Sequence, residues 1–190
     1  MGVLFGLRAV NVPKLKGPFI LAPNHTSFLD PMLVQLVMPR HVSFMMDGKL
    51  YHHKLFCWFY RFWRVIPLSS ATRAVGAMKD CLRAVKSGEL VGIFPEGHIA
   101  SDGQLQEGMA GVGSLMLRSR VPVIPVAILG AYDVLPRRAQ FPRAGRILIV
   151  FGEPIQPDAE VGDRKEASQK LTVRVMEQIK ALQLEHASQR

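Results

Sequence analysis

The stretch FILAPNHTSFLDP, residues 19–31, joins an apolar run to the start of a helix. Its first four residues, 19–22, are all apolar, which is typical of a strand that is buried on both faces of a sheet. The pair Asp30 and Pro31 predicts a helix start, with the aspartate as N-cap and the proline at the first helical position. His25 is therefore expected in the loop between strand and helix, at the carboxyl end of the strand.

The remainder of the chain repeats this alternation of strand and helix. Further apolar runs predict strands at residues 42–46, 90–94, 123–128 and 147–151. Apolar residues at helical spacing predict helices over residues 31–38, 72–87, 109–119 and about 164–186. The pattern predicts a single α/β domain, residues 1–190, with a mostly parallel central sheet flanked by helices. In such a sheet, ligands bind at the carboxyl ends of the strands.

The composition fits one domain with an anionic partner. A chain of 190 residues is long enough for one domain with a proper core. The formal net charge is +9, which favours nucleic acid, an acidic membrane face or a phosphate-bearing substrate. The uncharged run 121–132 contains two prolines and falls short of the about 20 residues that a bilayer span needs. Residues 1–12 lack the length and cleavage pattern of a signal peptide, and the two cysteines, Cys57 and Cys81, favour a reducing compartment.

The spacing of His25 and Asp30 suits general base catalysis. A short turning segment can bring the carboxylate to an imidazole nitrogen, where it fixes the tautomer and stabilises the imidazolium that forms on proton uptake. Proton transfer by a positioned side chain is typically worth about 10²–10⁴ in rate. The alternative is that Asp30 only caps the helix and that His25 is an ordinary loop histidine, because bare pairs at this spacing arise by chance.

Three segments resemble motifs of the glycerol-3-phosphate and lysophosphatidate acyltransferase superfamily. Residues 24–30, NHTSFLD, resemble its first motif, Asn-His-x-Ser-x-x-Asp. The sequence FPEG at 94–97 resembles its third motif and follows an apolar run, as it does in that family. The run VPVIPV at 121–126 resembles the proline-bearing fourth motif. The motifs occur in the family's order within a core of about residues 15–157, and the C-terminal helix follows this core.

The resemblance implies a reaction and a role for each matched residue. In that family the histidine deprotonates a hydroxyl of the acceptor, the aspartate orients the histidine, and the hydroxyl attacks an acyl thioester. Carried over, His25 is the general base and Asp30 its orienting partner. Glu96, Gly97 and Ser27 are expected to bind substrate. The acyl donor is expected to be acyl-CoA or acyl carrier protein, as a co-substrate and with no bound cofactor.

The chain departs from the family's motifs where arginines bind phosphate. The second motif usually reads Gly-x-Ile-Pro-x-x-Arg, but residues 64–70 read RVIPLSS, so Ser70 occupies the arginine position. After FPEG the family often continues Thr-Arg-Ser, whereas residues 98–101 read HIAS, which is closer to bacterial lysophospholipid acyltransferase domains. The acceptor is therefore expected to be lysophosphatidate or another lysoglycerophospholipid. The candidates to bind its phosphate instead are Arg73, Arg64 and Lys49.

Residues 49–64 gather seven of the chain's 15 aromatic side chains, with lysines and arginines interleaved. Aromatic residues of this kind favour the membrane interface and basic residues are attracted to anionic lipid, so an anionic membrane surface is expected, with core packing as the alternative. Nucleic acid is not expected, because no helix-turn-helix or RNA-binding motif accompanies the segment. No metal is expected either, because His52, His53 and Cys57 lack a second ligand pair at a familiar spacing.

These features predict a peripheral enzyme on the cytoplasmic face of a membrane that transfers a fatty acyl group from a thioester to a lysophospholipid hydroxyl. Two other functions share the same residues. A basic membrane-binding module with an inactive site accounts for the missing arginines. A thioesterase or lipase uses water in place of the lipid alcohol, and Ser27 is then the serine that lies close to His25 in the sequence.

Overall fold

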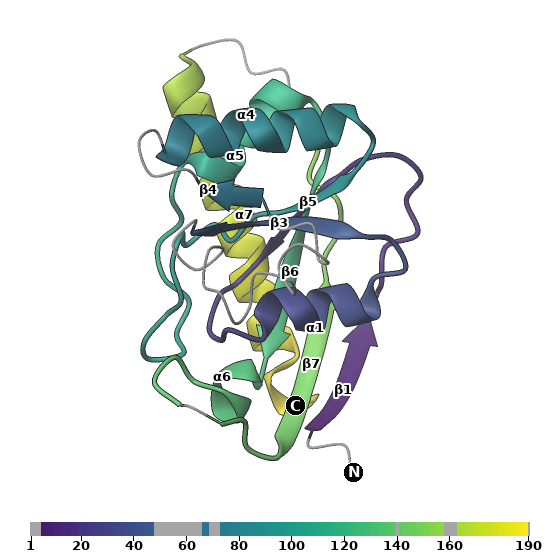
Figure 1. The fold of residues 1–190 in the computed structure, drawn as a ribbon, viewed down its shortest axis with the longest axis vertical. Helices are drawn as coiled ribbons and strands as arrows, with labels where there is room; N and C mark the ends of the chain where they lie inside the picture. The colour runs from purple at the N-terminus through teal and green to yellow at the C-terminus, as the bar shows by residue number, and fades with distance from the viewer. Residues whose placement is uncertain (1–4, 48–65, 69–72, 140, 158–162, 190) are drawn as a thin grey trace.

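The computed structural model describes residues 5–47, 66–68, 73–139, 141–157 and 163–189. Within these ranges the chain forms a seven-stranded sheet with helices on both faces, in the order β1-β7-β6-β2-β5-β3-β4 (Figure 1). The strands are β1 (Phe5–Val10), β2 (Ile20–Pro23), β3 (Val42–Asp47), β4 (Ile66–Leu68), β5 (Leu90–Gly92), β6 (Val123–Leu129) and β7 (Gly145–Phe151). The helices are α1 (Asp30–Val37), α4 (Arg73–Lys86), α5 (Gly111–Ser119), α6 (Ala131–Val134), α7 (Arg164–Glu185) and the 3-10 turn η1 (Ala187–Gln189).

The sheet is parallel except at one junction. β2 pairs in parallel with β5 and β6, and β3 pairs in parallel with β4 and β5. β6 and β7 pair antiparallel, and β1 lies parallel to β7 at the edge. The predicted α/β class with a mostly parallel sheet is confirmed. The predicted strands and helices are also confirmed to within a few residues at their ends.

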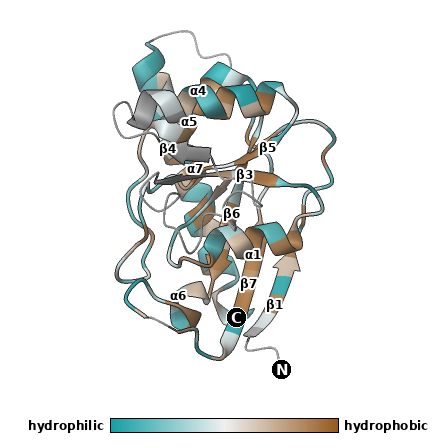
Figure 2. Ribbon diagram, in the orientation of Figure 1, coloured by the Kyte–Doolittle hydropathy of each residue, from teal (hydrophilic) through white to brown (hydrophobic). Residues whose placement is uncertain are grey.

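Both faces of the central strands are buried, because helices cover the sheet on each side. Successive residues of a strand point to opposite faces. Phe19 and Leu21 accordingly pack with α1, whereas Ile20 and Ala22 pack with α4, α5 and α7. Figure 2 shows β5 and most of β7 in the hydrophobic colour. Burial on both faces explains why β2 is a continuous apolar run instead of an alternating one.

The start of α1 corrects the predicted helix cap. The helix begins at Asp30, so the N-cap position belongs to Leu29, whose backbone is already helical. Pro31 lies in the first turn, as predicted. The carboxylate of Asp30 does not cap the helix because three hydrogen-bond donors of the preceding loop point at it, and it turns back toward them.

Three loops meet at one edge of the sheet. β5, β2 and β6 are adjacent and run in the same direction, so the segments that follow them leave from the same edge. These segments are residues 24–29, the FPEG turn, residues 94–97, and helix α6 with the residues after it. We call residues 24–29 the catalytic loop because the sequence predicts that role for them. The topology therefore brings together segments about 70 and 100 residues apart in the sequence, and two of them carry the expected site.

Candidate active site

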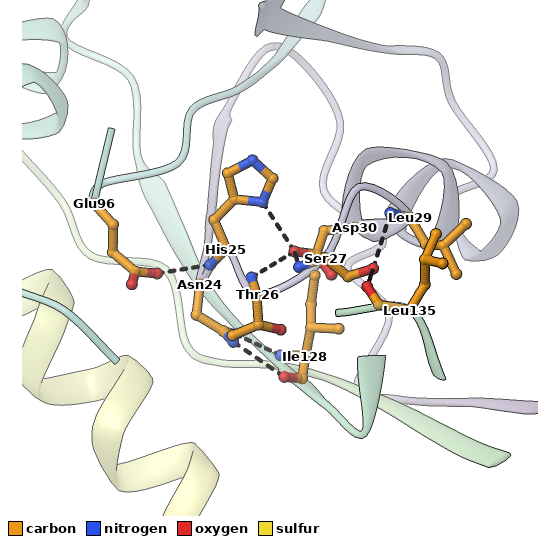
Figure 3. A network of polar contacts seen from close by, with 9 residues as sticks. All are labelled: Asn24, His25, Thr26, Ser27, Leu29, Asp30, Glu96, Ile128 and Leu135. Carbon is orange, nitrogen blue, oxygen red and sulfur yellow. Dashed lines mark hydrogen bonds and ion pairs between the residues drawn. The ribbon is translucent and has the colours of Figure 1, made fainter. Parts of the chain in front are cut away.

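His25 and Asp30 face each other across the catalytic loop. The Nδ1 atom of His25 lies 2.9 Å from Oδ2 of Asp30. Figure 3 shows the other ring nitrogen, Nε2, pointing away from Asp30. Because a carboxylate at Nδ1 selects the tautomer that carries its proton there, Nε2 is left with a free lone pair. The imidazole is 14% exposed and the carboxylate is fully buried. The pair can therefore accept a proton at Nε2, and Asp30 can stabilise the resulting positive charge.

Backbone amides hold the Asp30 carboxylate in place. Its Oδ2 atom also accepts hydrogen bonds from the amides of Thr26, at 2.7 Å, and Ser27, at 2.8 Å. Among the described residues, Oδ1 has no hydrogen-bond partner and is buried. Burial raises the pKa of Asp30 above its ordinary value of 3.8, while the hydrogen bond and the attraction of His25, followed by the two amides, lower it. Three groups of the loop thus contact the same oxygen atom, Oδ2 of Asp30.

Asn24 anchors the start of the catalytic loop to β6. Its side-chain amide donates to the carbonyl oxygen of Ile128 at 3.1 Å, and its carbonyl oxygen accepts from the Ile128 amide at 2.7 Å. These two bonds extend the pairing of β2 with β6 by one residue beyond Pro23. The side-chain amide of Asn24 takes the place that a backbone peptide group has in the rest of the pairing. Asn24 is fully buried. The sequence places Asn24 in the motif but gives no sign of this role, because Ile128 is 104 residues away.

Glu96 ties the catalytic loop to the FPEG turn. One carboxylate oxygen accepts from the His25 amide at 2.6 Å, and the other accepts from the Gln106 amide at 2.9 Å. Glu96 is fully buried, and burial raises the pKa of its carboxyl group against the lowering effect of those hydrogen bonds. The carbonyl oxygen of His25 accepts in turn from the Ala100 amide at 2.8 Å. The two motifs expected at one sheet edge are therefore in direct contact.

Phe94 limits the orientation of the His25 imidazole. Its ring stacks on that of His25 with a centroid distance of 3.7 Å and an interplanar angle of 16°, and Phe44 of β3 lies behind it, with 5.4 Å between the centroids of the two phenylalanine rings.

Gly97, the last residue of the turn, adopts a φ of +70°, a conformation that residues other than glycine rarely take. A Cβ atom there would also collide with the Met109 sulfur.

The hydroxyl of Ser27 bonds to the backbone. It donates to the carbonyl oxygen of Leu135 at 2.7 Å and accepts from the Leu29 amide at 3.1 Å. An isolated bridge also pairs Ser27 with Pro136. These contacts join the catalytic loop to the segment that follows α6. The expected roles of Ser27, Glu96 and Gly97 in substrate binding stay predictions, and Glu96 and Ser27 have the structural contacts described above.

The candidate phosphate ligands lie outside the described side chains. Arg73 begins α4, but its side chain is not among those the structure describes. Lys49, Arg64 and the whole aromatic segment 49–64 fall outside the described ranges, and so does Ser70. Within the described residues, no group of three or more histidine, cysteine or acidic side chains could hold a metal ion. In the same part of the chain, every helix is too short or too polar to cross a bilayer.

The sequence and the fold both match known acyltransferases. The family model described as Acyltransferase matches residues 8–129. A chloroplastic 1-acyl-sn-glycerol-3-phosphate acyltransferase of Brassica napus is 26% identical over 148 residues, which cover 76% of this chain and 43% of that protein. The corresponding protein of Bacillus subtilis is 24% identical over 176 residues, 91% of this chain and 84% of its own. The chain thus spans under half the length of the plant relative.

A solved structure shares the fold. The crystal structure of the 1-acyl-sn-glycerophosphate (LPA) acyltransferase of Thermotoga maritima superposes with a TM-score of 0.72 at 24% sequence identity. The superposition covers 93% of this chain and 73% of that one. At this identity the similarity supports the α/β sandwich and the arrangement of its sheet.

Proposed function

The chain belongs to the Acyltransferase family, and we propose that it transfers a fatty acyl group from an acyl thioester to a hydroxyl of lysophosphatidate or another lysoglycerophospholipid. The observation that carries the proposal is the contact of 2.9 Å between His25 Nδ1 and Asp30 Oδ2, at an edge shared with the FPEG turn. The relatives named as 1-acyl-sn-glycerol-3-phosphate acyltransferases support the same acceptor class.

The reaction is a direct acyl transfer. Nε2 of His25 removes the proton of the acceptor hydroxyl as its oxygen attacks the thioester carbonyl carbon. Collapse of the tetrahedral intermediate breaks the carbon–sulfur bond, and the imidazolium returns its proton to the leaving thiolate. Asp30 stabilises the imidazolium between these two proton transfers. The donor is an acyl thioester of coenzyme A or of acyl carrier protein, and no other cofactor takes part.

Ser27 favours this direct route over a covalent acyl-enzyme. A serine nucleophile needs its proton directed at the general base. The Ser27 hydroxyl instead donates to the carbonyl oxygen of Leu135 and is fully buried. His25 is therefore left for the hydroxyl of an incoming acceptor. Because that acceptor is a membrane lipid, we place the enzyme at the membrane surface as a peripheral protein, on the cytoplasmic face.

The test is a transfer assay with both donors and a panel of acceptors. Purified protein is incubated with acyl-CoA or acyl carrier protein thioesters and with lysophosphatidate and lysolipids of other head groups, and the lipids are analysed by mass spectrometry. We expect a diacyl product that requires both donor and acceptor. Free fatty acid formed equally well without acceptor would identify a thioesterase instead. Vesicle binding without any product would identify a binding module with an inactive site.

A further inference from the structure

The segment that runs from the end of α6 into β7 is rich in arginine. From residue 134 to residue 152 the chain contains four arginines and no acidic residue. We refer to residues 136–146, of which the structure describes all but Gln140, as the arginine loop. Its arginines are Arg137, Arg138, Arg143 and Arg146, and all four side chains are exposed. Among the described residues, none of them forms an ion pair with a carboxylate.

The arginine loop lies beside the catalytic loop. β6 is parallel to β2, so the chain leaves β6 at the edge where it also leaves β2 for His25. The bridge between Ser27 and Pro136 and the hydrogen bond from Ser27 to the Leu135 carbonyl then join the two loops directly. Two backbone hydrogen bonds hold the start of the arginine loop in place: the Ala139 amide donates to the Pro136 carbonyl oxygen, and the Arg143 amide donates to that of Val134 at the end of α6. Its charges are thus held next to the site.

Two aromatic side chains project from the same pair of loops. Phe141, in the middle of the arginine loop, is 79% exposed, and Phe28, in the catalytic loop, is 46% exposed. A phenylalanine ring with this exposure is available to insert into the apolar layer of a membrane. The guanidinium groups of arginines, which the same loop supplies, bind phosphate oxygens, often with two hydrogen bonds each. Positive charge around an exposed aromatic ring matches an anionic bilayer, with phosphate groups outside and acyl chains beneath them.

We propose that the arginine loop docks the enzyme on an anionic lipid bilayer, with Arg137, Arg138 and Arg143 on the head groups and Phe141 inserted below them. The inference rests on the proposed function for its choice of partner, because a lipid acceptor must reach His25 from a bilayer. Docking at this edge turns the catalytic loop toward the lipid layer. A basic surface elsewhere on the molecule would hold the enzyme at the membrane without presenting its site.

The test compares two charge-matched double variants in vesicle sedimentation. R137Q/R138Q removes two charges from the arginine loop. R118Q/R120Q removes two exposed charges at the end of α5, just before β6 begins. The seven residues of β6 separate the two pairs by about 20 Å, which exceeds the Debye length of about 10 Å at 0.1 M salt. Vesicles of phosphatidylcholine with phosphatidylglycerol are compared with vesicles of phosphatidylcholine alone, in the absence of any acyl donor.

The expected result follows from the value of one basic residue near an anionic surface, which is about fivefold in partitioning. R137Q/R138Q should bind the anionic vesicles about 25-fold more weakly than wild type, and R118Q/R120Q should bind like wild type. F141S should lower binding by about tenfold on the same vesicles. Equal binding of the two double variants would overturn the proposal, and so would wild-type binding by F141S. Weaker binding of R137Q/R138Q to a single-stranded oligonucleotide, with vesicle binding unchanged, would assign the loop to nucleic acid instead.

Two separate readouts distinguish this proposal from the proposed function. Vesicle binding is measured without donor and therefore does not depend on turnover. Loop-dependent binding by a wild-type protein that makes no diacyl product would support the docking surface and reject the acyltransferase. Acyl transfer by wild type, together with equal vesicle binding of the two double variants, would support the enzyme and reject the surface.

Discussion

The substitution Asp30→Asn separates the charge of the Asp30 carboxylate from its hydrogen bonds. The amides of Thr26 and Ser27 both point at the atom that is Oδ2 in Asp30. An amide NH₂ group cannot face two donors, so the introduced asparagine must place its side-chain oxygen there and its NH₂ at the position of Oδ1. The oxygen can still accept the His25 Nδ1 proton, which keeps the tautomer. What is lost is the negative charge opposite the imidazolium.

The size of this loss follows from the geometry of the pair. The atoms lie 2.9 Å apart, which puts the two charge centres at a separation of about 4 Å. At an effective dielectric constant of about 20, two unit charges at that distance attract each other by about 4 kcal/mol. If the imidazolium is fully formed in the transition state, the rate of acyl transfer should fall by about 10³-fold. Asp30→Ala should be slower and less stable as well, because it leaves two buried amides without an acceptor, at about 1–3 kcal/mol each.

The stability of the Asp30→Asn variant should depend on pH with a definite sign. Burial raises the pKa of Asp30 above 3.8 in the folded protein, so the folded state favours the protonated form. The stability that wild type gains from protonation of Asp30 is fully present below the pKa that this carboxyl group has in the unfolded state. It is lost as the pH rises through the pKa of the group in the folded state. Asparagine carries no such charge. The stability of the variant relative to wild type should therefore increase as the pH rises above 3.8.

The assay combines acyl transfer with urea denaturation at acidic and at slightly alkaline pH. We predict a variant that is slow but folded, and whose stability relative to wild type increases from acidic to slightly alkaline pH. An Asp30→Asn enzyme within tenfold of the wild-type rate would refute the proposed role of the charge. A variant whose relative stability declines as the pH rises would refute the assigned pKa direction.

Three further predictions concern the surroundings of the site. Glu96→Gln should lower the free energy of unfolding by about 1–3 kcal/mol in urea denaturation, because one of two amide donors then faces an NH₂ group; unchanged stability would argue against the bridging role. Gly97→Ala should cost about 1–2 kcal/mol in the same measurement because of its φ of +70°, and a neutral result would show that the turn can relax. Burial raises the pKa of Cys81 to about 12, so in a Cys57→Ser background a thiol reagent at pH 8 should label it only after denaturation, and rapid labelling of the native protein would contradict this.

The apolar runs predict most of the fold because they record burial on both faces. Strands such as β2 and β6 have no solvent-facing side, so their composition alone marks them. β1 escapes this reasoning because Gly6 and Arg8 interrupt its apolar residues, and pairing with β7 stabilises it instead. The antiparallel pairing of β6 and β7 cannot be predicted from the sequence either, because strand direction depends on the path of the connecting chain.

The active site divides in the same way. His25 and Asp30 are predictable because they are five residues apart and a short loop can close on itself. The bonds of Asn24 to Ile128 and of Glu96 to the His25 amide are not, because each joins segments that only the folded sheet brings together. The predicted N-cap was wrong for a related reason. Aspartate is a common capping residue, but the donors that compete for the Asp30 carboxylate come close to it only once the loop is folded.

The most direct test of the account is product formation by His25→Ala, measured by mass spectrometry with an acyl thioester and the preferred lysolipid. His186→Gln, which removes an imidazole at the end of α7, is the matched control, and thermal denaturation verifies that both variants fold. We predict that diacyl product falls by about 10²–10⁴-fold for His25→Ala and stays at the wild-type level for the control. A folded His25→Ala protein that forms product at the wild-type rate would contradict the assignment of this histidine as the base.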